Sequence, residues 1–132
     1  MILYNTPELR EWLEERIRTT LHPETVFIGH RKNGKLVAAV GFSHYVPDND
    51  IELSVASDKG GGSRALIAAV FQYVFEQSRC RRCTIRTRPD NEPAIKLATR
   101  FGFKHEGTLR QGFPDADALI FGLLRDEYGI RR

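Results

Sequence analysis

The stretch IELSVASDKGGGSRALIAAVFQYVFEQ, residues 51–77, contains three consecutive glycines between two apolar patterns. In residues 51–56, apolar side chains alternate with polar ones, which predicts a strand with one buried face. After the glycines, apolar residues recur at helical spacing: Leu66, Ala69, Val70, Tyr73 and Val74. A strand, a glycine turn and a helix are typical of a βαβ unit, whose second strand we expect at residues 83–88.

The N-terminal part of the chain predicts a short first strand in the apolar stretch MILY, residues 1–4, then a helix and a hairpin. Residues 5–17 carry apolar side chains at helical spacing, with Thr6 as a candidate N-cap. Asn33-Gly34 predicts the two-residue turn of a β-hairpin, because both residues accept positive φ. The returning strand of this hairpin is expected to end near Tyr45.

The C-terminal part predicts one more helix and two more strands. The helix at 91–102 is expected to begin at Asn91 and to end at Gly102, and strands are expected at 103–109 and 116–124. The predicted order is therefore β-α-β-β-β-α-β-α-β-β. It indicates an α/β (α+β) fold with a single mixed, mostly antiparallel sheet, a central parallel βαβ unit and helices on both faces.

Bulk composition fits one domain spanning residues 1–132, with 41% hydrophobic and 28% charged residues. There is no apolar run of membrane-spanning length and no secretion signal, so we expect a cytoplasmic protein without a membrane partner. The net charge of +3 fits acidic or phosphate-bearing partners. The arginines of RCRRCTIRTR, residues 79–88, keep nucleic-acid binding as an alternative.

Cys80 and Cys83 form a single CxxC pair. A zinc site needs four ligands, and no second pair accompanies this one, so no metal site is expected. The pair follows a helix and opens a strand, whereas a thioredoxin-like motif follows a strand and opens a helix. We interpret both as ordinary cysteines in a reducing compartment.

On its residues alone, the glycine loop SDKGGGSRAL, residues 57–66, is a candidate anion site. A helix N-terminus carries partial positive charge, and glycines let a ligand approach the backbone. Lys59 and Arg64 add formal charge beside the loop. The loop matches neither GxGxxG nor GxxxxGK[ST], so a phosphate site and a flexible turn both stay open.

The stretch NEPAIKLATRFGFKHEGTLR, residues 91–110, resembles the final motif of the GCN5-related N-acetyltransferases (GNAT). The matching residues are Asn91, Ala94, Leu97, Gly102 and Phe103. The glycine loop then falls on the family's acetyl-CoA pyrophosphate loop, aligned at residues 58–63. The tail ALIFGLLRDEYG, residues 118–129, resembles the last strand of members that act on protein N-termini and related amines. The resemblance covers about residues 25–128, with a shorter first helical region.

This resemblance implies direct transfer of an acetyl group from acetyl-CoA to a primary amine of a peptide, a protein N-terminus or a small molecule. It implies that the pantetheine arm pairs with backbone near Val55 and that Asn91 contacts the cofactor or an attached water. The residues implied to hold the pyrophosphate are Lys59, Gly60, Gly61, Gly62, Ser63 and Arg64. Homodimers are common in the family, and a homodimer stays open here.

Glu52 is the predicted general base, because an attacking amine must be neutral and is mostly protonated at pH 7. Its side chain faces opposite to those of Ile51 and Leu53, and other family members carry a catalytic glutamate on this strand. A solvent-facing glutamate is the structural alternative. His44, on the neighbouring strand, is the alternative base.

Three departures from the family pattern leave questions. Many family members use a tyrosine as the general acid at the position of Ala98, and others use a serine at the position of Ala94. The general acid of this chain is therefore unidentified, and Tyr45 and Tyr128 are candidate proton donors. Asp58 stands where relatives carry glutamine or arginine, and a carboxylate there would oppose a pyrophosphate.

These departures motivate a second hypothesis, a catalytically impaired module that binds CoA or a partner. A third hypothesis is nucleic-acid binding by the arginines of residues 79–88, although the interleaved aromatic residues of RNA-binding surfaces are missing. Arg86 and Arg88 share one face of their strand and could instead line the acceptor cleft and select an acidic substrate. The short loop at 110–117 is expected to leave that cleft open.

Overall fold

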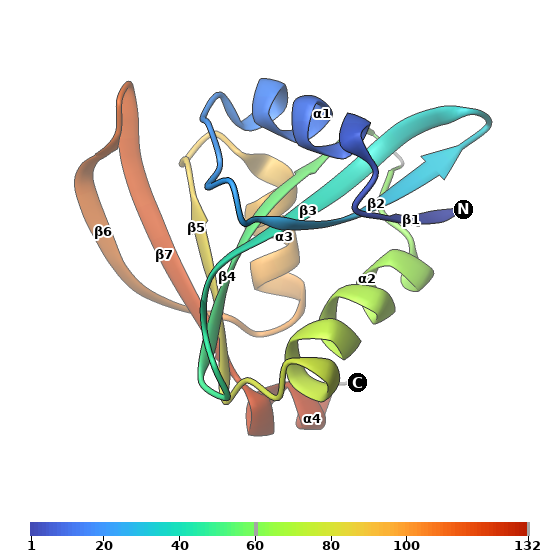
Figure 1. The fold of residues 1–132 in the computed structure, drawn as a ribbon. Helices are drawn as coiled ribbons and strands as arrows, with labels where there is room; N and C mark the ends of the chain where they lie inside the picture. Colours follow the sequence, from blue (N-terminus) through green and yellow to red (C-terminus); the bar gives the residue numbers. More distant parts are fainter. Residues whose placement is uncertain (60, 132) are drawn as a thin grey trace.

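A computed structural model describes residues 1–59 and 61–131 and gives a seven-stranded mixed sheet with helices on both faces (Figure 1). The strands are β1 (Ile2–Tyr4), β2 (Val26–Lys32), β3 (Lys35–Val46), β4 (Asp50–Ser57), β5 (Arg82–Thr87), β6 (Lys104–Phe113) and β7 (Ala116–Leu124). The helices are α1 (Pro7–Ile17), α2 (Arg64–Phe71), the π-helix η1 (Gln72–Gln77), α3 (Glu92–Arg100) and α4 (Arg125–Arg131).

The strand order in the sheet is β1-β2-β3-β4-β5-β7-β6. All neighbouring strands pair antiparallel except β4 and β5, which are parallel, so the predicted mixed sheet with a central βαβ unit is confirmed. The parallel pairing consists of Glu52 opposite Thr84 and Leu53 opposite Ile85. Beyond Leu53 the two strands diverge, which opens a gap in the middle of the sheet.

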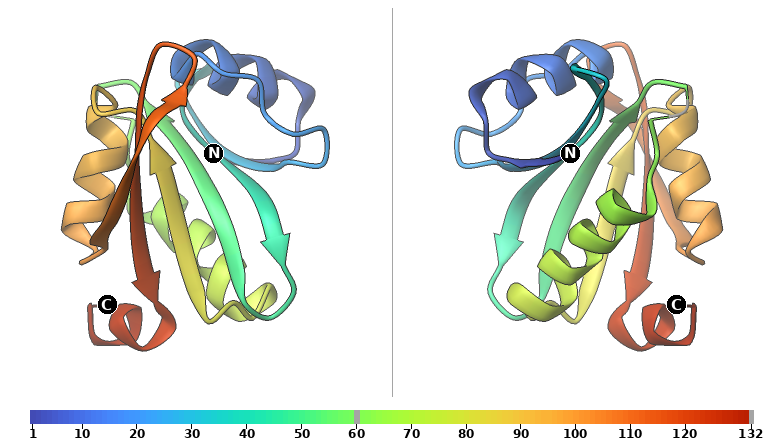
Figure 2. Two further views of the ribbon diagram at one scale, coloured as in Figure 1. Left: turned by 90° about the vertical axis from the view of Figure 1, so that its left-hand side faces the viewer. Right: turned by 90° about the vertical axis from the view of Figure 1, so that its right-hand side faces the viewer.

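Two apolar cores lie on the two faces of the sheet. On one face, α1 buries Leu9 and Leu13 in a cluster with Ala56 of β4. On the other face, α2, η1 and α3 pack against Leu53 and Val55, the alternate residues of β4. Figure 2 shows α2 behind the strands in its left view and in front of them in its right view. The alternation of residues 51–56 thus separates the two cores, but the prediction of a single buried face is wrong, because Ser54 and Ala56 on the other face are buried as well.

Several local predictions are confirmed by the backbone. Asn33 and Gly34 have φ of 52° and 80°, as the predicted hairpin turn requires. Asn91 caps α3 through a bond from Ala94 N to its Oδ1 at 3.3 Å, and Gly102 ends the helix with φ of 78°. Thr6 occupies the N-cap position of α1, but its hydroxyl makes no capping bond.

The last strand, predicted at 116–124, is confirmed as β7, but the chain beyond Leu124 forms α4, a helix that the sequence did not predict. The predicted second helix continues from α2 into a π-helical segment, η1, that hydrophobic spacing does not distinguish. No helix in the described part of the chain has the length and apolar character needed to cross a membrane.

Candidate functional site

A cleft of about 650 Å³ lies over the C-terminal part of β4, between α2 and α3. Val55 and Ala56 of β4 line it, followed by Lys59 and Gly62 of the glycine loop. Other parts of the wall come from β3, from the apolar residues of α2 and from one face of α3 along its whole length. The predicted strand, loop and helix therefore meet around one hollow.

Asn91 bridges the gap at the head of α3. Its side-chain amide donates to the carbonyl oxygen of Val55 at 2.8 Å, while its Oδ1 accepts from Ala94 N. In an extended strand, the N–H and C=O of one residue point to the same side. The N–H of Val55 therefore faces the gap, where a ligand with amide groups could pair with it.

The glycine loop is a tight turn, not a linker. Gly61 N donates to Asp58 O at 2.8 Å, and Asp58 N donates to Val37 O at 2.8 Å, which ties the loop to β3. A Cβ on Gly61 would overlap Val37 O, whereas a Cβ on Gly62 would meet nothing within 4 Å. Gly60, assigned to the same loop from the sequence, lies outside the described residues.

The N-terminus of α2 and several basic side chains make the cleft favourable to anions. Ser63 caps α2 by accepting from Leu66 N at 3.0 Å. Lys59, Lys96 and Arg100 line the cleft. Sequence reasoning missed Lys96 and Arg100, although their spacing of four residues places both on one face of α3.

Asp58 does not stand as an isolated negative charge in the loop. Its carboxylate forms an ion pair with Arg16 of α1, with 3.2 Å between Arg16 Nε and Asp58 Oδ1. This pairing joins residues 42 positions apart, so no local pattern in the sequence indicates it. Arg16 therefore offsets the charge that the sequence comparison identified as unfavourable for a pyrophosphate.

A second pocket of about 170 Å³ is lined by residues on the α1 face of the sheet. Glu52 and Ser54 of β4 and Arg86 of β5 contribute to its wall, with His44 of β3 beside them. Val55 lines both hollows, so the two pockets meet where β4 and β5 diverge. A reaction between two molecules bound on opposite faces of the sheet could take place at this point.

Glu52 is largely buried in the second pocket, with 20% of its side chain exposed. Its Oε2 lies 3.3 Å from His44 Nδ1. Burial raises the pKa of Glu52 above its ordinary value, although His44 and Arg86 act in the opposite direction. A carboxylate with a raised pKa is better matched to accepting a proton near neutral pH.

The structure brings the two candidate bases together through an irregularity in β3. The register of β3 and β4 shifts between Ser43 and Val46, and His44 has φ of 52°. Without this bulge, strict alternation would place His44 on the face opposite to Ser43 and Glu52. The bulge therefore allows the imidazole to reach the carboxylate.

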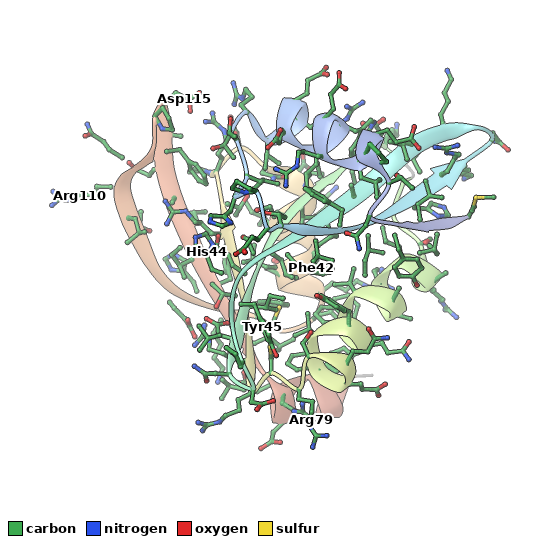
Figure 3. All side chains as sticks on the ribbon, viewed as in Figure 1. Phe42, His44, Tyr45, Arg79, Arg110 and Asp115 are labelled. Carbon is green, nitrogen blue, oxygen red and sulfur yellow. The ribbon has the colours of Figure 1, made fainter. Side chains whose placement is uncertain are left out.

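The candidate acids lie elsewhere. The Tyr45 hydroxyl donates to Ser78 O at 3.1 Å, at the end of η1, and Figure 3 shows Tyr45 lower on β3 than His44. The Tyr128 ring packs against Phe71, with 4.7 Å between ring centroids. Ala94 and Ala98 are buried in the core. No tyrosine lines either pocket in the part of the chain that the structure describes.

The remaining candidates from the sequence have structural partners. Arg82 pairs with Asp50 and Glu106, and Arg88 pairs with Asp90 and Asp115. These pairs offset charges on which nucleic-acid binding by residues 79–88 would depend. Cys80 and Cys83 are free thiols buried in the core. Burial raises the pKa of Cys80 to about 11 and that of Cys83 well above its ordinary value, so neither is a reactive thiolate.

Solved structures resemble this fold over nearly the whole chain. The spermidine/spermine N-acetyltransferase SpeG from Vibrio cholerae superposes with a TM-score of 0.73 at 14% identity, covering 99% of this chain and 98% of that one. PseH, an N-acetyltransferase from Campylobacter jejuni solved in complex with acetyl coenzyme A, gives a TM-score of 0.63 at 12% identity, covering 95% and 99%.

Sequence comparison gives a curated relative and a family. The relative is the UPF0157 protein YqkA of Bacillus subtilis (strain 168), 26% identical over 102 residues. The match covers 74% of this chain but only 29% of YqkA, so the chain spans less than a third of that protein. The model of the Acetyltransferase (GNAT) family matches residues 2–103. The chain therefore belongs to the GNAT family of acetyltransferases.

Proposed function

We propose that this protein is an acetyl-CoA-dependent N-acetyltransferase that acetylates a primary amine. The observation that carries the proposal is the meeting of two pockets at Val55. The α2 and α3 side offers a helix N-terminus and basic side chains for a phosphorylated ligand. The α1 side offers Glu52, a largely buried carboxylate suited to accept a proton.

The cleft fits acetyl-CoA, which supplies a thioester carbonyl as the acyl donor. The N–H of Val55 points to the same side as its carbonyl oxygen, which Asn91 binds, so it faces the place proposed for an amide of the pantetheine arm. In the glycine loop, Gly62 lines the cleft just before the N-terminus of α2, which favours a pyrophosphate, and Gly61 packs against β3 beside it. The other residues proposed for this loop are Lys59, Gly60, Ser63 and Arg64.

In the proposed mechanism, Glu52 accepts the proton that the ammonium form of the acceptor must lose, directly or through a water. The Nδ1 atom of His44 lies 3.3 Å from Oε2 of Glu52 and orients the carboxylate by sharing a proton with it. Among the described residues, no tyrosine lines either pocket, so none is placed to protonate the departing thiolate. A thiol has a pKa near ~8.5, so the thiolate can leave without a dedicated acid and take its proton from water.

The first experiment separates an enzyme from a module that only binds. Calorimetry with acetyl-CoA and CoA measures cofactor binding, and thiol release with pools of peptides, polyamines and aminoglycosides measures transfer. We expect binding and turnover with at least one pool. Binding without turnover across every pool supports the impaired module, and no binding at all refutes the proposed function. Salt-dependent binding of DNA or RNA would favour the nucleic-acid hypothesis.

A cytoplasmic location and a homodimer remain predictions from the sequence. Cell fractionation tests the first, and light scattering of the purified protein at several concentrations tests the second.

A further inference from the structure

Arg86 occupies a defined place in the acceptor pocket. It lies two residues beyond Thr84, the parallel partner of Glu52, and on the same face of the sheet. From strand spacing and rise, the Cα atoms of Glu52 and Arg86 are roughly 8 Å apart. Both side chains line the second pocket. One small molecule could therefore contact the carboxylate and the guanidinium at the same time.

The guanidinium of Arg86 is held from the β6 side of the pocket. Its Nη2 donates to the carbonyl oxygen of Gly112 at 2.7 Å, and its Cζ lies 5.2 Å from the centroid of the Phe113 ring. The Arg86 side chain is half-buried. These contacts fix the planar group while its other N–H donors remain available to a ligand.

Arg86 differs from its neighbours because it interacts with a carboxylate, that of Glu52, only at a distance longer than an ion pair. Arg82 and Arg88, on either side of it, each form ion pairs with two carboxylates. Among the described residues, no carboxylate oxygen lies within 4.0 Å of the Arg86 guanidinium. A half-buried charge without a close counter-ion is favourable for binding an anion, and a carboxylate matches the fork of a guanidinium.

We propose that Arg86 binds a carboxylate of the acceptor, and that the acceptor class is a primary amine carrying a carboxylate on the same molecule. The amine lies at Glu52 and the carboxylate at Arg86. This inference rests on the proposed N-acetyltransferase function and adds a substrate class to it. Polyamines lack a carboxylate and would place positive charge beside Arg86, so they are expected to be poor acceptors.

The test compares acceptors that differ only in this carboxylate. The pairs are β-alanine with its amide, and the C-terminally amidated dipeptides Glu-Ala with Gln-Ala and Asp-Ala with Asn-Ala. In the wild type, we expect kcat/KM to favour the carboxylate member of at least one pair by about 10- to 100-fold. Equal rates within every pair, or a preference for polyamines, would overturn the proposal.

Variants then assign that preference to one side chain. Arg86→Gln is expected to abolish the preference, and Arg86→Lys to keep part of it, because an ammonium retains charge but not the planar fork. Arg110→Gln is the matched control, because Arg110 is exposed on β6 and Figure 3 shows it pointing away from the sheet. If Arg86 acts only as a counter-charge to Glu52, Arg86→Gln slows both members of each pair equally, which contradicts the proposal.

A binding measurement separates this inference from the proposed function. Calorimetry with the N-acetylated Glu-Ala and Gln-Ala amides requires no turnover. Preferential binding of the Glu-Ala product, lost in Arg86→Gln, supports the carboxylate site even if no amine is acetylated. Equal binding of the two products, together with turnover of both amines, refutes the carboxylate site and leaves the acetyltransferase proposal intact.

Discussion

Gly61 is the position where a single methyl group should most clearly disturb the glycine loop. In Gly61→Ala, the new Cβ would overlap Val37 O and would lie 2.8 Å from Ser57 Oγ and 2.9 Å from the carbonyl carbon of Val37. Real Cβ atoms essentially never approach other heavy atoms closer than 3.0 Å. Because the obstacle is backbone of β3, the loop itself must move.

The cost of that movement follows from the contacts it strains. Val37 O also accepts the hydrogen bond from Asp58 N that ties the loop to β3. Overpacking of this kind costs about 1–3 kcal/mol. For a chain of this size, each kcal/mol lowers Tm by about 3–6 °C, so a cost near ~2 kcal/mol corresponds to roughly 6–12 °C. CoA binding should weaken roughly tenfold, because the backbone N–H groups leave their positions.

Thermal unfolding with and without CoA measures both effects, and Gly62→Ala provides the matched control. A Cβ on Gly62 would meet nothing within 4 Å, so the unliganded variant should unfold at the wild-type temperature or slightly above it. If Gly61→Ala and Gly62→Ala unfold at the same temperature, the loop is not packed against β3 as described, and the assignment of Gly61 to a tight cradle fails.

Three further predictions concern other parts of the molecule. If Glu52 is the base, kcat/KM should rise with pH through the raised pKa of Glu52 and then level off. Glu52→Gln should remove this rise and lower the rate about 10²-fold, whereas an unchanged pH profile would exclude Glu52 as the base. Asp58→Gln should change the Kd for CoA less than about fivefold in calorimetry, because Arg16 already offsets the carboxylate; a tenfold tighter complex would contradict this. Leu13→Ala should lower the free energy of unfolding by about 2–5 kcal/mol in urea titration, since Leu13 of α1 is fully buried against the sheet, and a loss below ~1 kcal/mol would contradict that packing.

The order of elements and the location of the cleft could be predicted because their signals are local. The alternation of residues 51–56 separates the two cores, and Asn91 caps the helix that it was expected to begin. The glycine loop and this helix belong to one family pattern, which indicated that they lie together. Each of these signals lies within about twenty consecutive residues, the range over which backbone preference and periodicity act.

The details that give the site its chemistry depend on contacts that no local pattern contains. His44 reaches Glu52 because a bulge reverses its facing, and strict alternation cannot indicate a bulge. The ion pair of Asp58 with Arg16 connects the glycine loop to α1, which lies on the face of the sheet opposite to α2 and α3. Of the two arginines expected to select an acidic substrate, Arg88 is already paired with Asp90 and Asp115, while Arg86 is not.

The divergence of β4 and β5 also gives the sheet an edge in its interior. An outer edge strand can pair with the strand of another molecule, which is a route to aggregation. Here the edge formed by residues 54–57 lies beneath α1 and α3, both of which contact β4. A slender ligand can add to it as a strand would, whereas a polypeptide strand with side chains on both faces would collide with these helices. The fold thus keeps a strand-pairing surface available to a small molecule while shielding it from self-association.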